Sequence, residues 1–105
     1  MVTFIELTGF SKKRDCFFTD DDFRKFQQAL IENPEKGDVI ANTKGFRKVR
    51  WGLDNKGKSG GVRVIYYYIN AAGRIYLALV YPKKEQGNLT SEQEKALRDI
   101  ASQLE

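Results

Sequence analysis

Basic residues spaced two apart on predicted strands are the part of this sequence that best fits chemistry on a phosphate. Alternation in an extended strand places Lys48 and Arg50 on one face and Arg47 on the other. On the following strand, Arg63 alternates with apolar residues. If helices cover one face of the sheet, Lys48, Arg50 and Arg63 converge on the open face. Crowded like charges repel, so this cluster predicts an anionic partner.

The charge of the 105-residue chain is unevenly divided. Residues 44–84 hold ten Lys or Arg against one acid, Asp54, for a net charge of +9, while the remainder carries −5. The pair Lys83-Lys84 closes this basic stretch, at the rim of the predicted open face. For each residue taken alone, a second interpretation stays open, in which the cation only solvates an exposed strand.

The residue types limit the reactions that this chain can catalyse. Histidine is absent and Cys16 is the single cysteine, so zinc sites, disulfide frameworks and histidine-assisted nucleophiles lack their residues. No set of carboxylates accompanies the basic stretch to hold Mg²⁺. We therefore expect no metal and no cofactor. Any RNA cleavage would use the 2′-hydroxyl of the substrate as nucleophile, with arginines stabilising the phosphorus oxygens and a lysine of lowered pKa taking the proton.

One segment matches the phosphate-binding loop pattern G-x-x-x-x-G-K-[ST], namely Gly52-Leu53-Asp54-Asn55-Lys56-Gly57-Lys58-Ser59. That loop binds phosphates because it leaves a strand and opens a helix. Here the residues that follow, 62–69, are strongly strand-like. We therefore interpret the segment as a basic hairpin loop, in which Lys56 and Lys58 can contact phosphates.

Aromatic residues lie among the cations, and bases stack on aromatic rings, so the mixture is typical of a surface for single-stranded RNA. Core packing is the competing interpretation and accounts for about two thirds of these rings. We expect RNA contacts at six positions: Arg47, Lys56, Lys58, Tyr67, Tyr81 and Lys83.

Capping signals and periodicity predict a single α+β domain over residues 1–105, with element order β-α-α-β-β-β-α. The strands are predicted at Val2–Leu7, Phe46–Gly52, Val62–Asn70 and Arg74–Tyr81. The helices are predicted at Gly9–Phe18, from Thr19-Asp20-Asp21-Asp22 to before Pro34, and from the capping box Thr90-Ser91-Glu92-Gln93 through Leu104. We expect a mainly antiparallel sheet with all helices packed on one face.

Three segments, read together with the element order, resemble the RelE/HigB-type toxins of bacterial toxin–antitoxin modules, closest to the HigB-like branch. They are Gly45-Phe46-Arg47-Lys48-Val49-Arg50, Gly60-Gly61-Val62-Arg63-Val64-Ile65-Tyr66-Tyr67 and Tyr81-Pro82-Lys83-Lys84-Glu85. The resemblance spans the chain from Phe4 to the final helix. It implies the RelE-like fold and a ribosome-dependent, metal-independent messenger-RNA endonuclease that inhibits translation.

The resemblance also implies four catalytic residues. Lys48 matches a basic position often given the proton-abstracting role, and Arg50 a neighbouring cation. Arg63 matches the arginine that holds the scissile phosphate, and Lys84 a basic residue that aids the leaving group. Some members carry a substrate-contacting tyrosine a few residues later, but the stretch Gln86-Gly87-Asn88-Leu89-Thr90 has none. Tyr81 or Tyr67 could substitute for it.

The partners implied by the resemblance are a cognate antitoxin, the ribosome and messenger RNA. The opening residues lack a signal-peptide pattern and no apolar run is long enough to cross a bilayer, so we expect a cytoplasmic protein without membrane contacts. A non-catalytic RNA- or ribosome-binding module is the alternative function. Direct DNA binding by the chain alone is not expected, because its cations fall on strands and loops rather than on a recognition helix.

Overall fold

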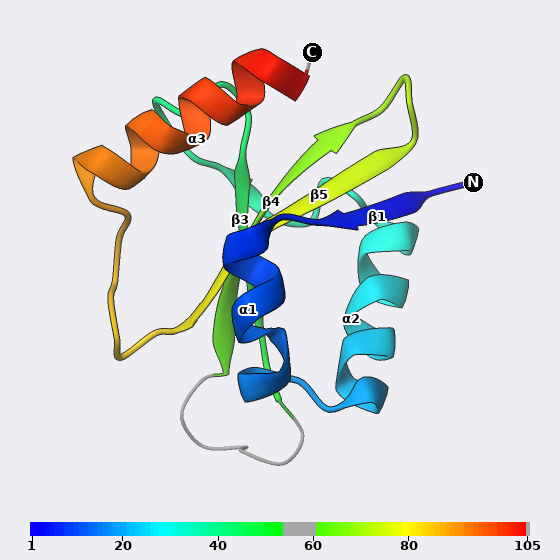
Figure 1. Cartoon of the computed structure of the whole chain (residues 1–105). Coiled ribbons are helices and arrows are strands. Elements are labelled where there is room, and N and C mark those ends of the chain that lie inside the picture. Colours follow the sequence, from blue (N-terminus) through cyan, green and yellow to red (C-terminus); the bar gives the residue numbers. More distant parts are fainter. Residues whose placement is uncertain (54–60, 105) are drawn as a thin grey trace.

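The computed structural model describes residues 1–53 and 61–104, and within these ranges five strands form one sheet in the order β1-β5-β4-β3-β2 (Figure 1). The strands are β1 (Thr3–Glu6), β2 (Asp38–Val39), β3 (Arg47–Trp51), β4 (Val62–Ile69) and β5 (Arg74–Pro82). The helices are α1 (Thr8–Phe17), α2 (Asp20–Glu32) and α3 (Ser91–Leu104). β1 pairs with β5 in parallel and the other neighbours are antiparallel. The predicted α+β class and element order are confirmed, and β2 is an additional strand.

Helices α1 and α2 cover one face of the sheet. The Thr19 side chain caps α2 by accepting a hydrogen bond from the Asp22 amide at 3.0 Å, as predicted, and three acids occupy the first turn. Phenylalanines of both helices and their connection pack together and against this face of the strands: Phe10, Phe18, Phe23 and Phe26. The Trp51 ring meets the Phe26 ring edge-on, with centroids 5.3 Å apart. This layer forms the larger part of the core.

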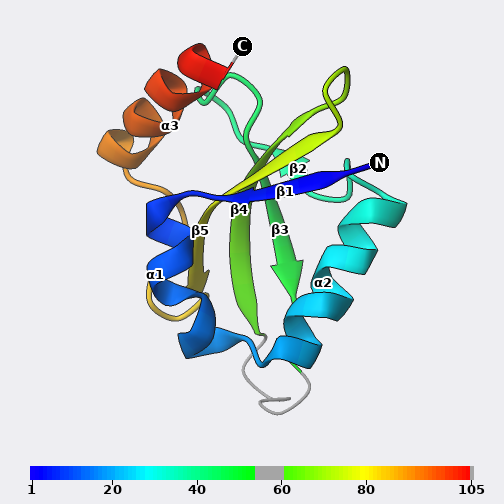
Figure 2. The same cartoon turned by 45° about the vertical axis from the view of Figure 1, so that its right-hand side comes forward.

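Helix α3 packs on the opposite face of the sheet, so the expectation that all helices share one face is wrong. Its buried residues Leu97 and Ala101 contact a second core cluster that includes Phe46, Tyr67 and Tyr76. Figures 1 and 2 show α3 apart from α1 and α2 in both views. The physical reason is that most of β4 is apolar on both faces and buried on both, which requires a cover on each side.

The capping box at the start of α3 is confirmed. The Gln93 amide donates to the Thr90 hydroxyl at 3.1 Å, and the Thr90 amide donates to the Gln93 side chain at 3.0 Å. At the other end, Lys44 donates to the Ser102 hydroxyl at 2.7 Å and Arg98 to the Asn42 carbonyl at 2.9 Å. These contacts fix α3 over one end of its face of the sheet, where Phe46 and Tyr67 lie. The described helices include none that is long and apolar enough to span a membrane.

Candidate phosphate-binding site

The end of the sheet face that α3 leaves uncovered holds a pocket of about 340 Å³, here called the cationic pocket. Its lining residues come from three strands and from the segment between β5 and α3: Asp38, Lys48, Arg50, Arg63, Lys83, Gly87 and Asn88. The described lining residues therefore include four cations and one carboxylate. Its volume falls at the lower end of the range of roughly 300–1,000 Å³ typical of ligand pockets. The predicted convergence of Lys48, Arg50 and Arg63 is confirmed.

Two of the arginines that line this pocket stand directly opposite each other on neighbouring strands. Arg50 on β3 is the register partner of Arg63 on β4, and Arg63 is only 6% exposed. Residues directly opposite in an antiparallel pair have side chains about 5 Å apart, and like charges there destabilise the pair. An anion between them removes that repulsion and can accept several charge-assisted hydrogen bonds. The geometry is therefore suited to a phosphate.

Tyr81 continues the same row onto β5, where it is the register partner of Arg63. Its hydroxyl is buried and has no hydrogen-bond partner among the described residues. Burial raises the pKa of Tyr81, while the positive charge of Arg63 opposes part of that rise. The hydroxyl is therefore kept as a protonated donor beside Arg63. Tyr81 does not line the cationic pocket, so its ring offers no exposed face there for a base.

Asp38 is the site residue that the sequence did not predict. It lies on β2, a strand of two residues, as the register partner of Lys48. Within the described ranges its carboxylate makes no hydrogen bond or ion pair. A segment of two residues is too short to show a strand period, and Asp38 precedes the basic stretch of the sequence. The one signal available was the predicted end of the second helix before Pro34, four residues earlier.

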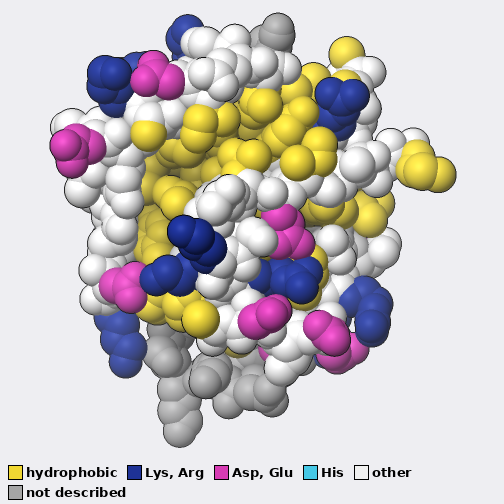
Figure 3. All heavy atoms as spheres, in the orientation of Figure 1, with side chains coloured by type: hydrophobic (Ala, Val, Ile, Leu, Met, Phe, Trp, Pro, Cys, Tyr) yellow, Lys and Arg dark blue, Asp and Glu magenta, His cyan; other side chains and the backbone are white. Residues whose placement is uncertain are grey.

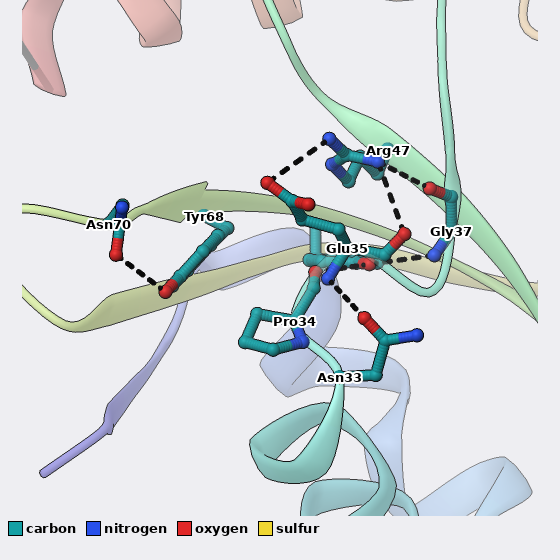
Figure 4. Close-up of polar contacts among 8 residues, drawn as sticks. Asn33, Pro34, Glu35, Gly37, Arg47, Tyr68 and Asn70 are labelled. Carbon is teal, nitrogen blue, oxygen red and sulfur yellow. Dashed lines mark hydrogen bonds and ion pairs between the residues drawn. The ribbon is translucent and has the colours of Figure 1, made fainter.

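Two side chains from the other face of the sheet hold the turn that precedes Asp38, and Figure 4 shows one of them, Arg47, beside Glu35 and Gly37. The Tyr66 hydroxyl accepts from the Gly37 amide at 2.9 Å and donates to the Pro34 carbonyl at 2.7 Å. Arg47 donates to the Gly37 carbonyl at 2.7 Å and to the Glu35 carbonyl at 3.3 Å. Burial raises the pKa of Tyr66, and the Gly37 hydrogen bond opposes part of that rise. The position of Asp38 is therefore determined by two side chains that lie on the opposite face of the sheet.

Several predicted site residues lie away from the cationic pocket. Arg47 points to the α2 face, where it holds the turn just described. The Tyr67 ring is 4% exposed and packs against Phe46 with centroids 4.9 Å apart, so it belongs to the core beneath α3 rather than to an RNA-stacking surface. Lys84 lines a separate hollow with Cys16, Phe17 and Leu53, whereas its neighbour Lys83 lines the cationic pocket. Lys56 and Lys58 lie outside the described residues.

A second hollow, of about 510 Å³, differs in chemistry from the cationic pocket. It lies between α3 and the β1–α1 junction, and none of its described lining residues is charged. Figure 3 shows this face, where hydrophobic side chains form a broad continuous area. Of these two hollows, the cationic pocket therefore holds the groups that could act on a phosphate.

The part of the chain that the structure describes contains no group of three or more Cys, Asp or Glu side chains that could hold a metal ion.

Comparison with known families identifies the family of the chain. Residues 24–105 match a family described as RelE toxin of RelE / RelB toxin-antitoxin system. That description names RelE, and the finer HigB-like assignment stays a prediction. Because the match covers more than half of the chain, the chain belongs to the RelE toxin family and is the toxin of a toxin–antitoxin module, with an antitoxin as its partner.

Proposed function

We propose that this toxin is a metal-independent endoribonuclease that cuts messenger RNA on the ribosome and so inhibits translation. The observation that supports this most directly is the placement of Arg50 opposite Arg63 in one pocket with Lys48 and Lys83. Four cations around a small volume suit a phosphodiester whose charge increases during the reaction. This substrate also implies a cytoplasmic location.

The proposed reaction is attack of the ribose 2′-oxygen on the adjacent phosphorus. Arg63 and Arg50 bind the non-bridging oxygens, where negative charge develops in the pentavalent transition state. The leaving 5′-oxygen needs a proton, and we assign its delivery to Lys83, because Lys83 lines the pocket while Lys84 faces another hollow. Lys48 adds positive charge beside Arg50. The products are a 2′,3′-cyclic phosphate and a 5′-hydroxyl.

Dependence on the ribosome is supported by the absence of aromatic residues among the described residues of the cationic pocket. Proteins that bind single strands unaided stack bases on exposed rings, whereas Tyr67 and Tyr81 are buried here. The pocket can therefore hold a phosphate but offers little for the bases. The ribosome would supply that positioning by presenting the message in a fixed geometry.

The test is induction of the toxin in cells lacking its antitoxin, followed by mapping of messenger-RNA ends and analysis of their chemistry. We expect new ends that carry 2′,3′-cyclic phosphates, and we expect Arg50→Gln to abolish them. Arg74→Gln is the matched control, because Arg74 is an exposed strand arginine at the opposite end of β5 and does not line the pocket. Arrest of translation with intact messages would support the alternative, a non-catalytic RNA- or ribosome-binding module.

A further inference from the structure

Asp38 is the one carboxylate among the described lining residues of the cationic pocket, and its presence there needs a chemical explanation. Asp38 lies among Lys48, Arg50, Arg63 and Lys83, where a phosphate is expected to bind. A negative charge at such a place repels the phosphate and weakens its binding. A pocket that served only to bind RNA would do better with a neutral residue there. The carboxylate must therefore contribute something that binding alone does not require.

The proposed reaction needs a proton acceptor, and the cations of the pocket are poor candidates for it. A lysine ammonium has three donors and no acceptor, and an arginine guanidinium has five donors and no acceptor. The remaining lining residues, Gly87 and Asn88, offer only amide oxygens. An ionised carboxylate has several lone pairs available at neutral pH. Among the described lining residues, Asp38 is thus the group whose ordinary form can accept a proton.

The position of Asp38 suits this role. As the register partner of Lys48 it lies on the same sheet face, at the edge strand, with Arg63 two strands away on β4. A phosphate held by Arg50 and Arg63 would therefore have a carboxylate on one side. The turn before Asp38 is fixed by the Tyr66 and Arg47 hydrogen bonds to Gly37. A general base must be within hydrogen-bond reach of its proton, and a rigid support keeps it there.

We propose that Asp38 is the general base that takes the 2′-hydroxyl proton, an inference that rests on the proposed endonuclease function. The 2′-oxygen forms a bond to phosphorus as its proton passes to the Asp38 carboxylate. The bond between phosphorus and the 5′-oxygen breaks, and that oxygen receives a proton from the Lys83 ammonium. Exchange with water then returns Asp38 to its ionised form and Lys83 to its charged form. Lys48 stabilises the developing charge.

The test uses the full-length toxin with ribosomes carrying a messenger RNA, under single-turnover conditions. We expect Asp38→Asn to lower the cleavage rate by about 10²-fold or more, as general bases commonly do, while ribosome binding stays equal or becomes tighter. Asp15→Asn is the matched control, because Asp15 is an exposed aspartate on α1, 86% exposed at its side chain. An Asp38→Asn variant that cleaves within about threefold of wild type, or faster, would overturn the proposal.

Chemical rescue separates a base from a residue that only supports the structure. Formate should restore cleavage to Asp38→Ala, and no restoration would count against the role. If wild type itself yields no 2′,3′-cyclic product, the proposed function fails, whereas wild-type cleavage unaffected by Asp38→Asn refutes only the assignment of the base.

Discussion

Replacement of Tyr66 by phenylalanine should weaken the fold and also displace the site, because one hydroxyl joins β4 to the turn before Asp38. Tyr66 is fully buried, and its hydroxyl both accepts from the Gly37 amide and donates to the Pro34 carbonyl. The phenylalanine ring has the same shape, so the substitution creates no cavity in the core. The expected loss therefore comes from two hydrogen bonds alone.

The expected change in the free energy of unfolding follows from the polar groups that Tyr66→Phe leaves without partners. Loss of the donated bond lowers the free energy of unfolding by about 1 kcal/mol, and the buried Gly37 amide left without a partner lowers it by about 1–2 kcal/mol more. The total of about 2–3 kcal/mol corresponds to a fall of at least ~8 °C in Tm for a domain of this size. Arg47 still binds the Gly37 carbonyl, so the turn loosens without detaching. Cleavage should fall as well, because a base displaced by about 1 Å can lower the rate about 10²-fold.

The assay is urea unfolding of purified toxin, with the midpoints compared at constant m-value. Tyr68→Phe is the matched control, since the Tyr68 hydroxyl donates to Asn70 at 3.0 Å in an exposed position. That variant should stay within about 0.5 kcal/mol of wild type. Equal losses in the two variants would refute the reasoning, because the buried and exposed hydroxyls would then contribute alike. Unchanged cleavage by a destabilised Tyr66→Phe variant would refute the link from the turn to the site.

Three more predictions concern the sheet. Arg50→Gln should raise the free energy of unfolding by about 0.2–1 kcal/mol at low salt by removing the charge opposite Arg63, and urea midpoints at about 1 M salt should show the gain screened away. Gly61→Ala should cost more than about 1 kcal/mol in the same assay, because Gly61 has φ +64° and an added Cβ would overlap the end of β3, whereas Gly52→Ala meets nothing within 4 Å. The raised pKa of Tyr81 means that the folded state retains this proton more strongly than the unfolded state. The resulting stability should be complete below pH about 10 and fall as pH rises further, and Tyr81→Phe should reduce that fall in an alkaline unfolding series.

The fold was predictable wherever a local signal was sufficient. The caps at Thr19 and Thr90 determined where two helices begin, because a side-chain oxygen and a nearby amide decide that position. The side of the sheet that α3 covers is a non-local property. An apolar stripe on a helix shows that one face is buried, but not against which layer it is buried. The evidence for the second layer was in β4, where apolar residues continue on both faces.

The site was predictable only in part, for a similar reason. Strict alternation correctly placed Lys48, Arg50 and Arg63 on one face, but it contains no information about where along that face α3 lies, and so Tyr67 was expected at the surface. Alternation also fails on β5, where the register shifts between the pairs Ile65–Leu79 and Tyr66–Leu77. This irregularity brings Tyr81 onto the same face as Tyr76, five residues earlier. A bulge of this kind depends on the partner strand and has no signature in the local sequence.

The structure explains how one strand can carry both a core and a charged site. Residues 64–67 of β4 are buried on both faces, so each side chain contributes to one of two hydrophobic clusters. Burial of apolar surface is worth roughly 25 cal/mol per Å², and this two-sided packing stabilises the strand that also holds Arg63 opposite Arg50. Like charges directly opposite each other on two strands lower stability as a rule, and the core does not require this pair. A binding site for an anion needs cations close together, and their mutual repulsion is tolerated here because the rest of the same strand is well packed. For the same reason, Arg50→Gln should raise the free energy of unfolding and abolish cleavage.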